Sequence, residues 1–544
     1  MSSPFVTLAT TVLDSWLGAH PSAATGLGDH THDHRLDDPS PAAADGRRAE
    51  LRVQLAGLDA VEVADRDEDV DRQVLRTELS AELFDLDELR EAEWNPMAHN
   101  PGGALYALAS RPYAPAAQRV AAARARLAEI PRYLVAARER LGELSRPHVE
   151  TARAQLAGTV GLIDELLPAL AAEAGAELGD EADAARTAVE EHRRWLKDRL
   201  DSATRDPRIG PDLFRAKLAL TLDTDFAPAD LLARAEDDLD RVGAQLLAEA
   251  GTFAATAAAS PATVREVLDE LAREVATDDT ILQVCRDAMV SATDFVRAEQ
   301  LVTVYDDPVE VIEMPEIDRG VAGAYCNPSG PLEARPMPTQ FAVSPTPEGW
   351  SQQRIDSYFR EYNLHMLHDL TVHEAMPGHA LQLMHSNRNP ASTPVRAVFF
   401  SGSFVEGWAV YAEELMAVRG YRRAESARAA SALRLQQLKM QLRSILNTIL
   451  DIRFHCHGLT EADAMRLMTE RAFQEEAEAV EKWQRVQLTS AQLCTYYVGY
   501  REVRDLVTEL RAARPDDTDL AIHDAVLGHG SPPVRHLRTL LLAQ

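Results

Sequence analysis

The chain has 544 residues, 86 of them acidic and 56 basic, and its formal net charge of −30 argues against nucleic acid and anionic membrane surfaces as partners. Hydrophobic residues make up 46% of the chain, which is ordinary for a globular protein, so the acidity does not indicate disorder. The four cysteines lie far apart and form no C-x-x-C pair, which is typical of a protein in a reducing compartment.

The first twenty residues predict neither an export signal nor a lipid anchor. They contain no basic leader, Asp14 interrupts their apolar run, and no early cysteine is available to carry a lipid. No apolar stretch of the chain approaches the roughly 18 residues that are needed to span a bilayer. We therefore expect a soluble cytoplasmic protein that has no membrane partner.

Helical periodicity dominates residues 1–300, which are expected to form an N-terminal helical half. Residues 20–46 are an exception because they are polar and rich in turn residues, whereas the Ala- and Arg-rich segment 116–142 predicts a long helix. Ser260 followed by Pro261 is typical of an N-cap and the first residue of a helix, so another helix is expected to begin there.

The composition changes within the segment 306–345, where proline and glycine become frequent. Two short runs, VEVIEM at 309–314 and TQFAV at 339–343, predict a small sheet there, and helical patterns resume afterwards. We expect a mainly α protein whose catalytic half spans 301–544, with the small sheet near an active-site cleft. No long linker separates the halves, so they are expected to form one compact unit.

The most informative segment runs from His373 to His379 and reads HEAMPGH. In the zinc-hydrolase motif H-E-x-x-H the histidines are four residues apart, but here they are six apart, which would separate them by roughly 120° on an unbroken helix. Pro377 lacks an N–H and clashes with the carbonyl of His373, while Gly378 permits backbone angles that are closed to other residues. We therefore expect the helix to break there and to return His379 to the side of His373.

A catalytic zinc site has three protein ligands and one open position. Glu406 lies on the next expected helix, and Glu413 lies almost two turns further along the same face. We prefer Glu406 as the third ligand and Glu413 as a residue that supports the ligands, although the reverse assignment stays open. Asp369, four residues before His373, is expected to hold the second nitrogen of that histidine.

Two further side chains could take part in hydrolysis. Glu374 directly follows the first histidine, as the glutamate does in H-E-x-x-H, and could take a proton from water. Tyr496 could donate its O–H to a developing oxyanion, with Tyr497 and Tyr500 as alternatives. Packing of all three tyrosines in an interface is an equally good reading of this cluster.

Three segments resemble a bacterial family known only as domain of unknown function 885. They read HEAMPGHALQ at 373–382, EGWAVYAEEL at 406–415 and AQLCTYYVGYREV at 491–503. The resemblance implies a large helical architecture like that of zinc carboxypeptidases and oligopeptidases. It also implies Zn²⁺ as the cofactor and assigns roles to five side chains: His373, His379 and Glu406 as ligands, Glu374 as the catalytic carboxylate, and Tyr496 as the tyrosine of the late motif.

These observations predict a zinc-dependent metallopeptidase that hydrolyses small peptides in the manner of a carboxypeptidase or an oligopeptidase. The alternatives are a metal-dependent hydrolase of a non-peptide amide or ester, and a non-catalytic helical binding protein with a structural metal. The net charge of −30 predicts that cationic or neutral peptides react faster than acidic ones. A terminal carboxylate of the substrate would need an arginine, and five are candidates by region: Arg319, Arg335, Arg501, Arg504 and Arg535.

Overall fold

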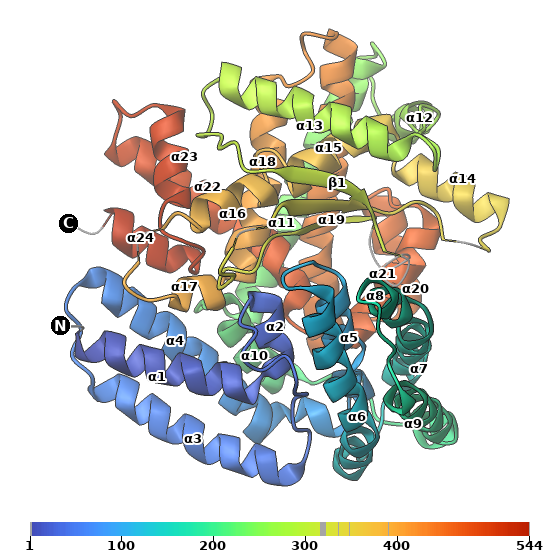
Figure 1. Cartoon of the computed structure of the whole chain (residues 1–544). Coiled ribbons are helices and arrows are strands. Elements are labelled where there is room, and N and C mark those ends of the chain that lie inside the picture. The colour runs from blue at the N-terminus through green and yellow to red at the C-terminus, as the bar shows by residue number, and fades with distance from the viewer. Residues whose placement is uncertain (1–2, 316–322, 336, 348, 390, 543–544) are drawn as a thin grey trace. The chain divides into compact units, whose positions relative to one another are not determined.

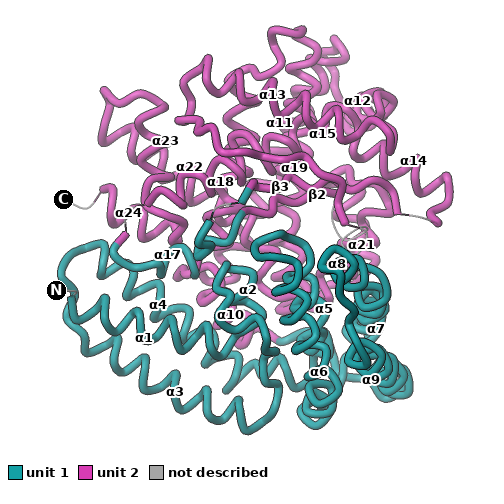
Figure 2. Tube along the Cα trace, in the orientation of Figure 1, with its two compact units in different colours: residues 1–209, 329–337, 392–398 teal, residues 210–328, 338–391, 399–544 magenta. Residues whose placement is uncertain are grey.

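The computed structural model describes residues 3–315, 323–335, 337–347, 349–389 and 391–542, and it is mainly helical (Figure 1). The chain divides into two compact units, which Figure 2 colours separately. Unit 1 contains residues 1–209, 329–337 and 392–398, and unit 2 contains residues 210–328, 338–391 and 399–544.

The helices of unit 1 follow one another along the first 209 residues, with a short one added later in the chain. They are α1 (Pro4–Ala19), α2 (Pro21–Leu27), α3 (Pro41–Ala60), α4 (Arg66–Phe84), α5 (Gly102–Ala109), α6 (Ala116–Arg140), α7 (Arg146–Gly161), α8 (Leu167–Glu173), α9 (Asp180–Lys197) and α17 (Val395–Val398).

Side-chain contacts explain why two later segments belong to unit 1. His30 Nε2 lies 3.2 Å from Glu333 Oε1. Arg396 Nε lies 2.5 Å from Asp71 Oδ1 on α4, and both of these side chains are buried. The histidine-rich stretch near residue 30 therefore anchors a segment of its own unit.

The helices of unit 2 are α10 (Pro211–Leu222), α11 (Pro228–Phe253), α12 (Pro261–Leu271), α13 (Ile281–Ala298), α14 (Gln352–Glu361), α15 (Leu364–Glu374), α16 (His379–Ser386), α18 (Gly402–Arg419), α19 (Ala427–His457), α20 (Glu461–Arg466), α21 (Glu476–Leu488), α22 (Thr495–Ala513), α23 (Asp519–Leu527) and α24 (Val534–Leu542). The units divide at residue 209 and not at the boundary near 300 that the sequence suggested. The reason is that α11 packs along α19, which joins residues 210–300 to the C-terminal half.

Local sequence determines where several helices begin. Ser260 caps α12 as predicted, because its side chain accepts from the backbone N–H of Thr263 and Pro261 occupies the first turn. The long helix predicted within 116–142 is α6. The polar segment 20–46 is less irregular than expected, since Pro21 starts the short helix α2 inside it.

The small sheet has three strands in the order β1-β3-β2, formed by Val309–Glu313 (β1), Ala324–Asn327 (β2) and Thr339–Val343 (β3). β1 runs parallel to β3, with Val311 opposite Phe341, and β2 runs antiparallel to β3. The two strands predicted from the sequence are β1 and β3. The edge strand β2 was not predicted.

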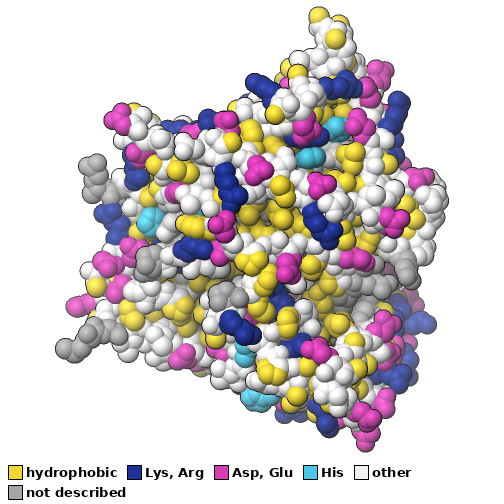
Figure 3. Space-filling model, turned by 45° about the horizontal axis from the view of Figure 1, so that its top comes forward, with side chains coloured by type: hydrophobic (Ala, Val, Ile, Leu, Met, Phe, Trp, Pro, Cys, Tyr) yellow, Lys and Arg dark blue, Asp and Glu magenta, His cyan; other side chains and the backbone are white. Residues whose placement is uncertain are grey.

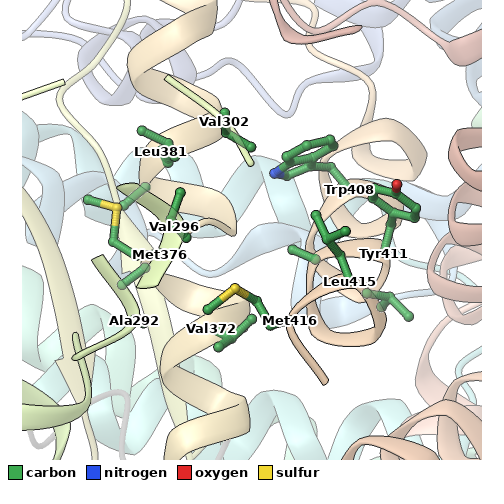
Figure 4. Close-up of a cluster of buried hydrophobic side chains, with 14 of the residues drawn as sticks. Ala292, Val296, Val302, Val372, Met376, Leu381, Trp408, Tyr411, Leu415 and Met416 are labelled. Atoms are coloured by element: carbon green, nitrogen blue, oxygen red, sulfur yellow. The ribbon is translucent and has the colours of Figure 1, made fainter. Parts of the chain in front are cut away.

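A hydrophobic cluster surrounds the helices that carry the HEAMPGH motif. Figure 4 shows Val372 of α15 and Met416 of α18 pointing toward each other, with Trp408 and Tyr411 further along α18. α18 also crosses α22 at a close backbone contact, where a Cβ added to Gly407 would lie 2.2 Å from the backbone of Gly499. Only glycine allows this approach.

Within the described part of the chain, no helix is both long enough and apolar enough to cross a membrane. Acidic side chains are interspersed with arginine and lysine over the face drawn in Figure 3. The negative charge on that face is therefore spread over the surface and does not form one patch.

Candidate metal centre

The helix breaks within the HEAMPGH motif, as the sequence predicts. α15 ends at Glu374 and α16 begins at His379. A Cβ on Gly378 would lie 1.9 Å from the carbonyl oxygen of His373, so only glycine fits at this position. The indole N–H of Trp408 donates to the carbonyl of Pro377 at 2.8 Å and ties the break to α18.

The break brings the two histidines together beside a carboxylate. Their ring centroids are 4.7 Å apart. Glu406 Oε2, on α18, lies 3.5 Å from His373 Nε2 and 3.7 Å from His379 Nε2. The three potential ligand atoms all lie within 4.8 Å of one another, and the described residues contain no second cluster of this kind.

These distances suit a tetrahedral cation. Zinc bonds of 2.0–2.1 Å place neighbouring ligand atoms about 3.3 Å apart, close to the two observed separations. Glu406 Oε2 is buried and has no hydrogen-bond partner, so a cation would satisfy it. Burial, together with the charge of His373, lowers the pKa of His379 to about 4, which leaves this imidazole neutral and able to bind metal. The residues present therefore fit a zinc ion.

Glu413 orients the first histidine. His373 Nδ1 donates to Glu413 Oε1 at 2.6 Å, and the Glu413 side chain is almost completely buried. Burial lowers the pKa of His373, but the carboxylates of Glu406 and Glu413 outweigh that effect and raise it well above the usual value. The pair of carboxylates thus favours a positive charge at this imidazole, which a proton or a metal ion can supply.

The expectation that Asp369 holds the second nitrogen of His373 is wrong, because Glu413 occupies that position. Asp369 is buried nearby, and its Oδ1 has no hydrogen-bond partner. Burial and the negative charge of Glu413 raise the pKa of Asp369 well above its usual value, which favours its neutral form. Glu413 reaches the imidazole from α18, whereas Asp369 lies one turn back on the histidine's own helix.

Glu374 is held between its helix and the edge strand. The side chain is 8% exposed, and the backbone N–H of Cys326 on β2 hydrogen-bonds to its carboxylate. Burial raises the pKa of Glu374 to about 7, with the Glu406 carboxylate adding to the rise and His373 opposing it. A carboxylate with a pKa near 7 can both accept and release a proton at neutral pH. The small sheet therefore borders the candidate site.

The three tyrosines have different partners. The Tyr497 hydroxyl donates to Asp238 Oδ2 at 2.7 Å, and the Tyr500 hydroxyl donates to Glu414 Oε2 at 2.6 Å. The Tyr496 oxygen instead accepts a hydrogen bond from Arg485 at 3.2 Å. Of the three, Tyr496 alone has an O–H that is not donated to a carboxylate.

Arg485 is a residue that sequence reasoning missed. Burial raises the pKa of Glu406, but His373, His379 and the charge of Arg485 outweigh it and lower that pKa. Arg485 therefore lies within electrostatic reach of the candidate ligand. The sequence did contain a signal that could have drawn attention to Arg485. Lys482 and Arg485 are three residues apart and so share one face of a helix, in a chain that has only four lysines.

Of the five arginines that the sequence did suggest, Arg319 lies outside the described residues and Arg335 belongs to unit 1. The other three are already engaged: Arg501 with Asp238, Arg504 with the Tyr500 hydroxyl, and Arg535 with Asp223.

Comparison with known families identifies relatives of the whole chain. The model of a family described as "Bacterial protein of unknown function (DUF885)" matches residues 21–541, and the chain belongs to this family. No curated protein matches the chain.

Two solved structures share the fold. One is described as a "putative lipoprotein of unknown function" from Shewanella oneidensis; it is 30% identical, with a TM-score of 0.84 over 99% of this chain and 100% of that one. The other is described as a "putative lipoprotein" from Colwellia psychrerythraea; it is 17% identical, with a TM-score of 0.81 over 99% of each chain. These descriptions overturn the expectation of a cytoplasmic location.

Proposed function

We propose that this member of the DUF885 family is a zinc-dependent metallopeptidase that hydrolyses small peptides, with an architecture like that of helical zinc peptidases. The observation that carries the proposal is the convergence of one potential ligand atom each from His373, His379 and Glu406 within 4.8 Å of one another. Three protein ligands are typical of catalytic zinc sites, whereas structural sites use four. The buried Glu374 next to the first ligand also favours an enzyme over a binding protein.

Zinc, when bound, supplies Lewis-acid polarisation of the peptide carbonyl and acidifies water. Glu374 then accepts a proton from the attacking water on its carboxylate and passes it to the departing amine nitrogen. Its pKa of about 7 suits both transfers. The hydrogen bond from the Cys326 N–H keeps the carboxylate in place between these transfers.

Tyr496 is the proposed donor to the oxyanion that forms during attack on the carbonyl. Because Arg485 donates to its oxygen, the O–H of Tyr496 stays free to donate elsewhere. A fixed donor aimed at the developing negative charge stabilises the transition state more than the ground state. Tyr497 and Tyr500 are less suitable, since each already donates to a carboxylate.

Glu413 orients His373 for metal binding. By accepting from His373 Nδ1, it fixes the tautomer that leaves the Nε2 lone pair directed toward the side where Glu406 and His379 converge. The Glu413 side chain is itself almost completely buried, which restrains this hydrogen bond.

The test combines metal analysis of the purified protein with a peptide-library cleavage screen in the presence and absence of a chelator. We expect one zinc per chain and cleavage that the chelator abolishes. Glu406→Gln should lose the metal, whereas Glu414→Gln, on the same helix, should keep it because Glu414 is bonded to Tyr500. Stoichiometric zinc without any peptide cleavage would contradict the metallopeptidase proposal, and ester or non-peptide amide cleavage would then replace it.

A further inference from the structure

Helix α23 packs against α16 and is hydrogen-bonded to α18, the two helices that carry the second and third candidate ligands. His379 is the first residue of α16, and Glu406 lies on α18. α23 carries two adjacent polar side chains, His523 and Asp524. The His523 side chain is completely buried, yet the proposed hydrolysis gives neither residue a role. Because buried polar groups are held by hydrogen bonds, the partners of this pair show what it does.

His523 joins α18 to the segment that follows α13. Its Nδ1–H donates to the carbonyl of Leu301 at 2.7 Å. Burial lowers the pKa of His523 and outweighs the opposite effect of the bond to Leu301, so the imidazole is neutral and has a single N–H. Its Nε2 is therefore an acceptor, and the Tyr411 hydroxyl of α18 donates to it at 2.9 Å.

Asp524 joins the same segment to α16. Its carboxylate accepts from the backbone N–H of Thr303 at 2.9 Å and from the Thr303 hydroxyl at 2.5 Å. The carbonyl of Thr303 in turn accepts from His385 Nε2 at 2.8 Å. His385 is buried in the last turn of α16, six residues after the ligand His379. The end of α16 that lies away from the metal centre is therefore anchored.

These hydrogen bonds connect the two ligand helices in one series, which we call the α23 bridge. It consists of Tyr411 on α18, His523 and Asp524 on α23, Thr303, and His385 on α16. All five residues belong to unit 2.

The imidazole of the bridge also supports the break in the HEAMPGH motif. The His523 ring packs against the Trp408 ring, with centroids 5.8 Å apart and planes at 74°. The indole N–H of Trp408 donates to the carbonyl of Pro377 inside the break. The start of α16 is therefore tied to α18 by Trp408, and its end is tied to α18 by the α23 bridge.

We propose that His523 and Asp524 are positioning residues that fix α16 relative to α18 and thereby set the distance between the ligands His379 and Glu406. This inference rests on the proposed function, because it concerns the metal on which that function depends. The nearest atoms of the two ligands lie 3.7 Å apart, and metal–ligand distances tolerate deviations of only about ±0.2 Å. α16 has only eight residues and begins with a ligand, so any pivoting of this helix would move that ligand.

The experiment measures the zinc affinity of the full-length protein by chelator competition and the stability of the metal-free protein as Tm. Tyr411→Phe removes the bond to His523, and His385→Phe removes the bond to Thr303, while both keep an aromatic ring in place. We expect each variant to bind zinc about 3-fold to 30-fold more weakly. Because both bonds belong to one series, the double variant should lose less than the product of the two single losses.

Matched controls come from unit 1. The Tyr113 hydroxyl donates to Asp33 at 2.6 Å, and the buried His99 donates from Nε2 to the carbonyl of Ala92 at 2.7 Å. Tyr113→Phe and His99→Phe therefore lose hydrogen bonds of the same two kinds. Each should lower Tm while leaving the zinc affinity unchanged.

Thr303→Val is a milder test within the α23 bridge, because it removes only the hydroxyl bond to Asp524, and it should also weaken zinc binding. Wild-type zinc affinity in the bridge variants, an equal loss in the controls, or losses that multiply in the double variant would overturn the positioning role and leave the metallopeptidase in place. If the bridge variants lose zinc as expected but the wild-type protein cleaves no peptide, the positioning role stands and the metallopeptidase falls. A wild-type protein that binds no zinc overturns both.

Discussion

Gly378→Ala tests whether the break in the HEAMPGH motif creates the metal centre. The new Cβ would lie 1.9 Å from the carbonyl oxygen of His373 and 2.3 Å from that of Val372. Normal contact between such atoms is more than 1 Å longer, and both obstacles are backbone atoms that cannot rotate away. The Gly378 N–H also donates to the Val372 carbonyl at 3.0 Å, and this hydrogen bond would be strained or lost.

The expected cost follows from these contacts. Relieving the overlap should cost about 2–3 kcal/mol as overpacking against rigid neighbours, and losing the backbone hydrogen bond should add about 1 kcal/mol. We therefore expect destabilisation of about 3–4 kcal/mol. Metal-ligand distances tolerate only about ±0.2 Å, so moving the His373 backbone by 1 Å should weaken zinc binding by at least about 100-fold.

The assays are urea unfolding of the metal-free protein and competition with a zinc chelator. Gly243→Ala is the matched control, because Gly243 lies inside α11 and a Cβ there would have no neighbour within 4 Å. The control should be stabilised by about 0.5–1 kcal/mol, since alanine is the better helix former, with zinc affinity unchanged. If Gly378→Ala binds zinc like the wild type, the steric argument for the break is refuted.

Four further results are expected. Glu374→Gln should keep its zinc but lower kcat by about 100-fold to 10,000-fold, and retained activity would exclude Glu374 as the base. Glu413→Gln should weaken zinc binding about 10-fold to 100-fold, because His373 loses its orienting carboxylate; unchanged affinity in chelator competition would assign the support to another residue. Neutral and cationic peptides should be cleaved faster than acidic ones, most clearly at low salt, and a flat salt series of kcat/KM would contradict this. Burial raises the pKa of Glu82, but Arg47 and His20 outweigh it and lower that pKa to about 2, so its stabilising effect is present above the usual pKa of 4.5 and is lost as the pH falls toward 2. Glu82→Gln should therefore be about 2 kcal/mol less stable than the wild type at pH 7 in urea unfolding, and a gap that does not shrink below pH 4.5 would rule out this pair as the cause.

The sequence by itself determined the features that depend on neighbouring residues. Pro377 and Gly378 end one helix and begin another because their effects on the backbone act within a single turn. Ser260 caps α12 for the same kind of reason. The strands β1 and β3 were predicted from their apolar runs, and family membership from motifs that can be read directly.

Tertiary structure decided which side chains meet. Strand β2 is only four residues long, and its pairing with β3 is what makes it a strand, so its sequence carried little signal. Asp369 and Glu413 were both reasonable partners for His373 by spacing, and only the packing of α18 against α15 gave the position to Glu413. Distances of this kind depend on contacts between residues far apart in the chain, which no local pattern records.

The partners of the arginines near the site likewise depend on contacts between residues far apart in the chain. Arginines were sought near the metal-binding motifs, but three of them are paired elsewhere once the chain folds. Arg485 lies on α21, and only the folded arrangement shows that it bonds Tyr496. The sequence determined the ligands that a metal could use, whereas the fold decided which charges surround them.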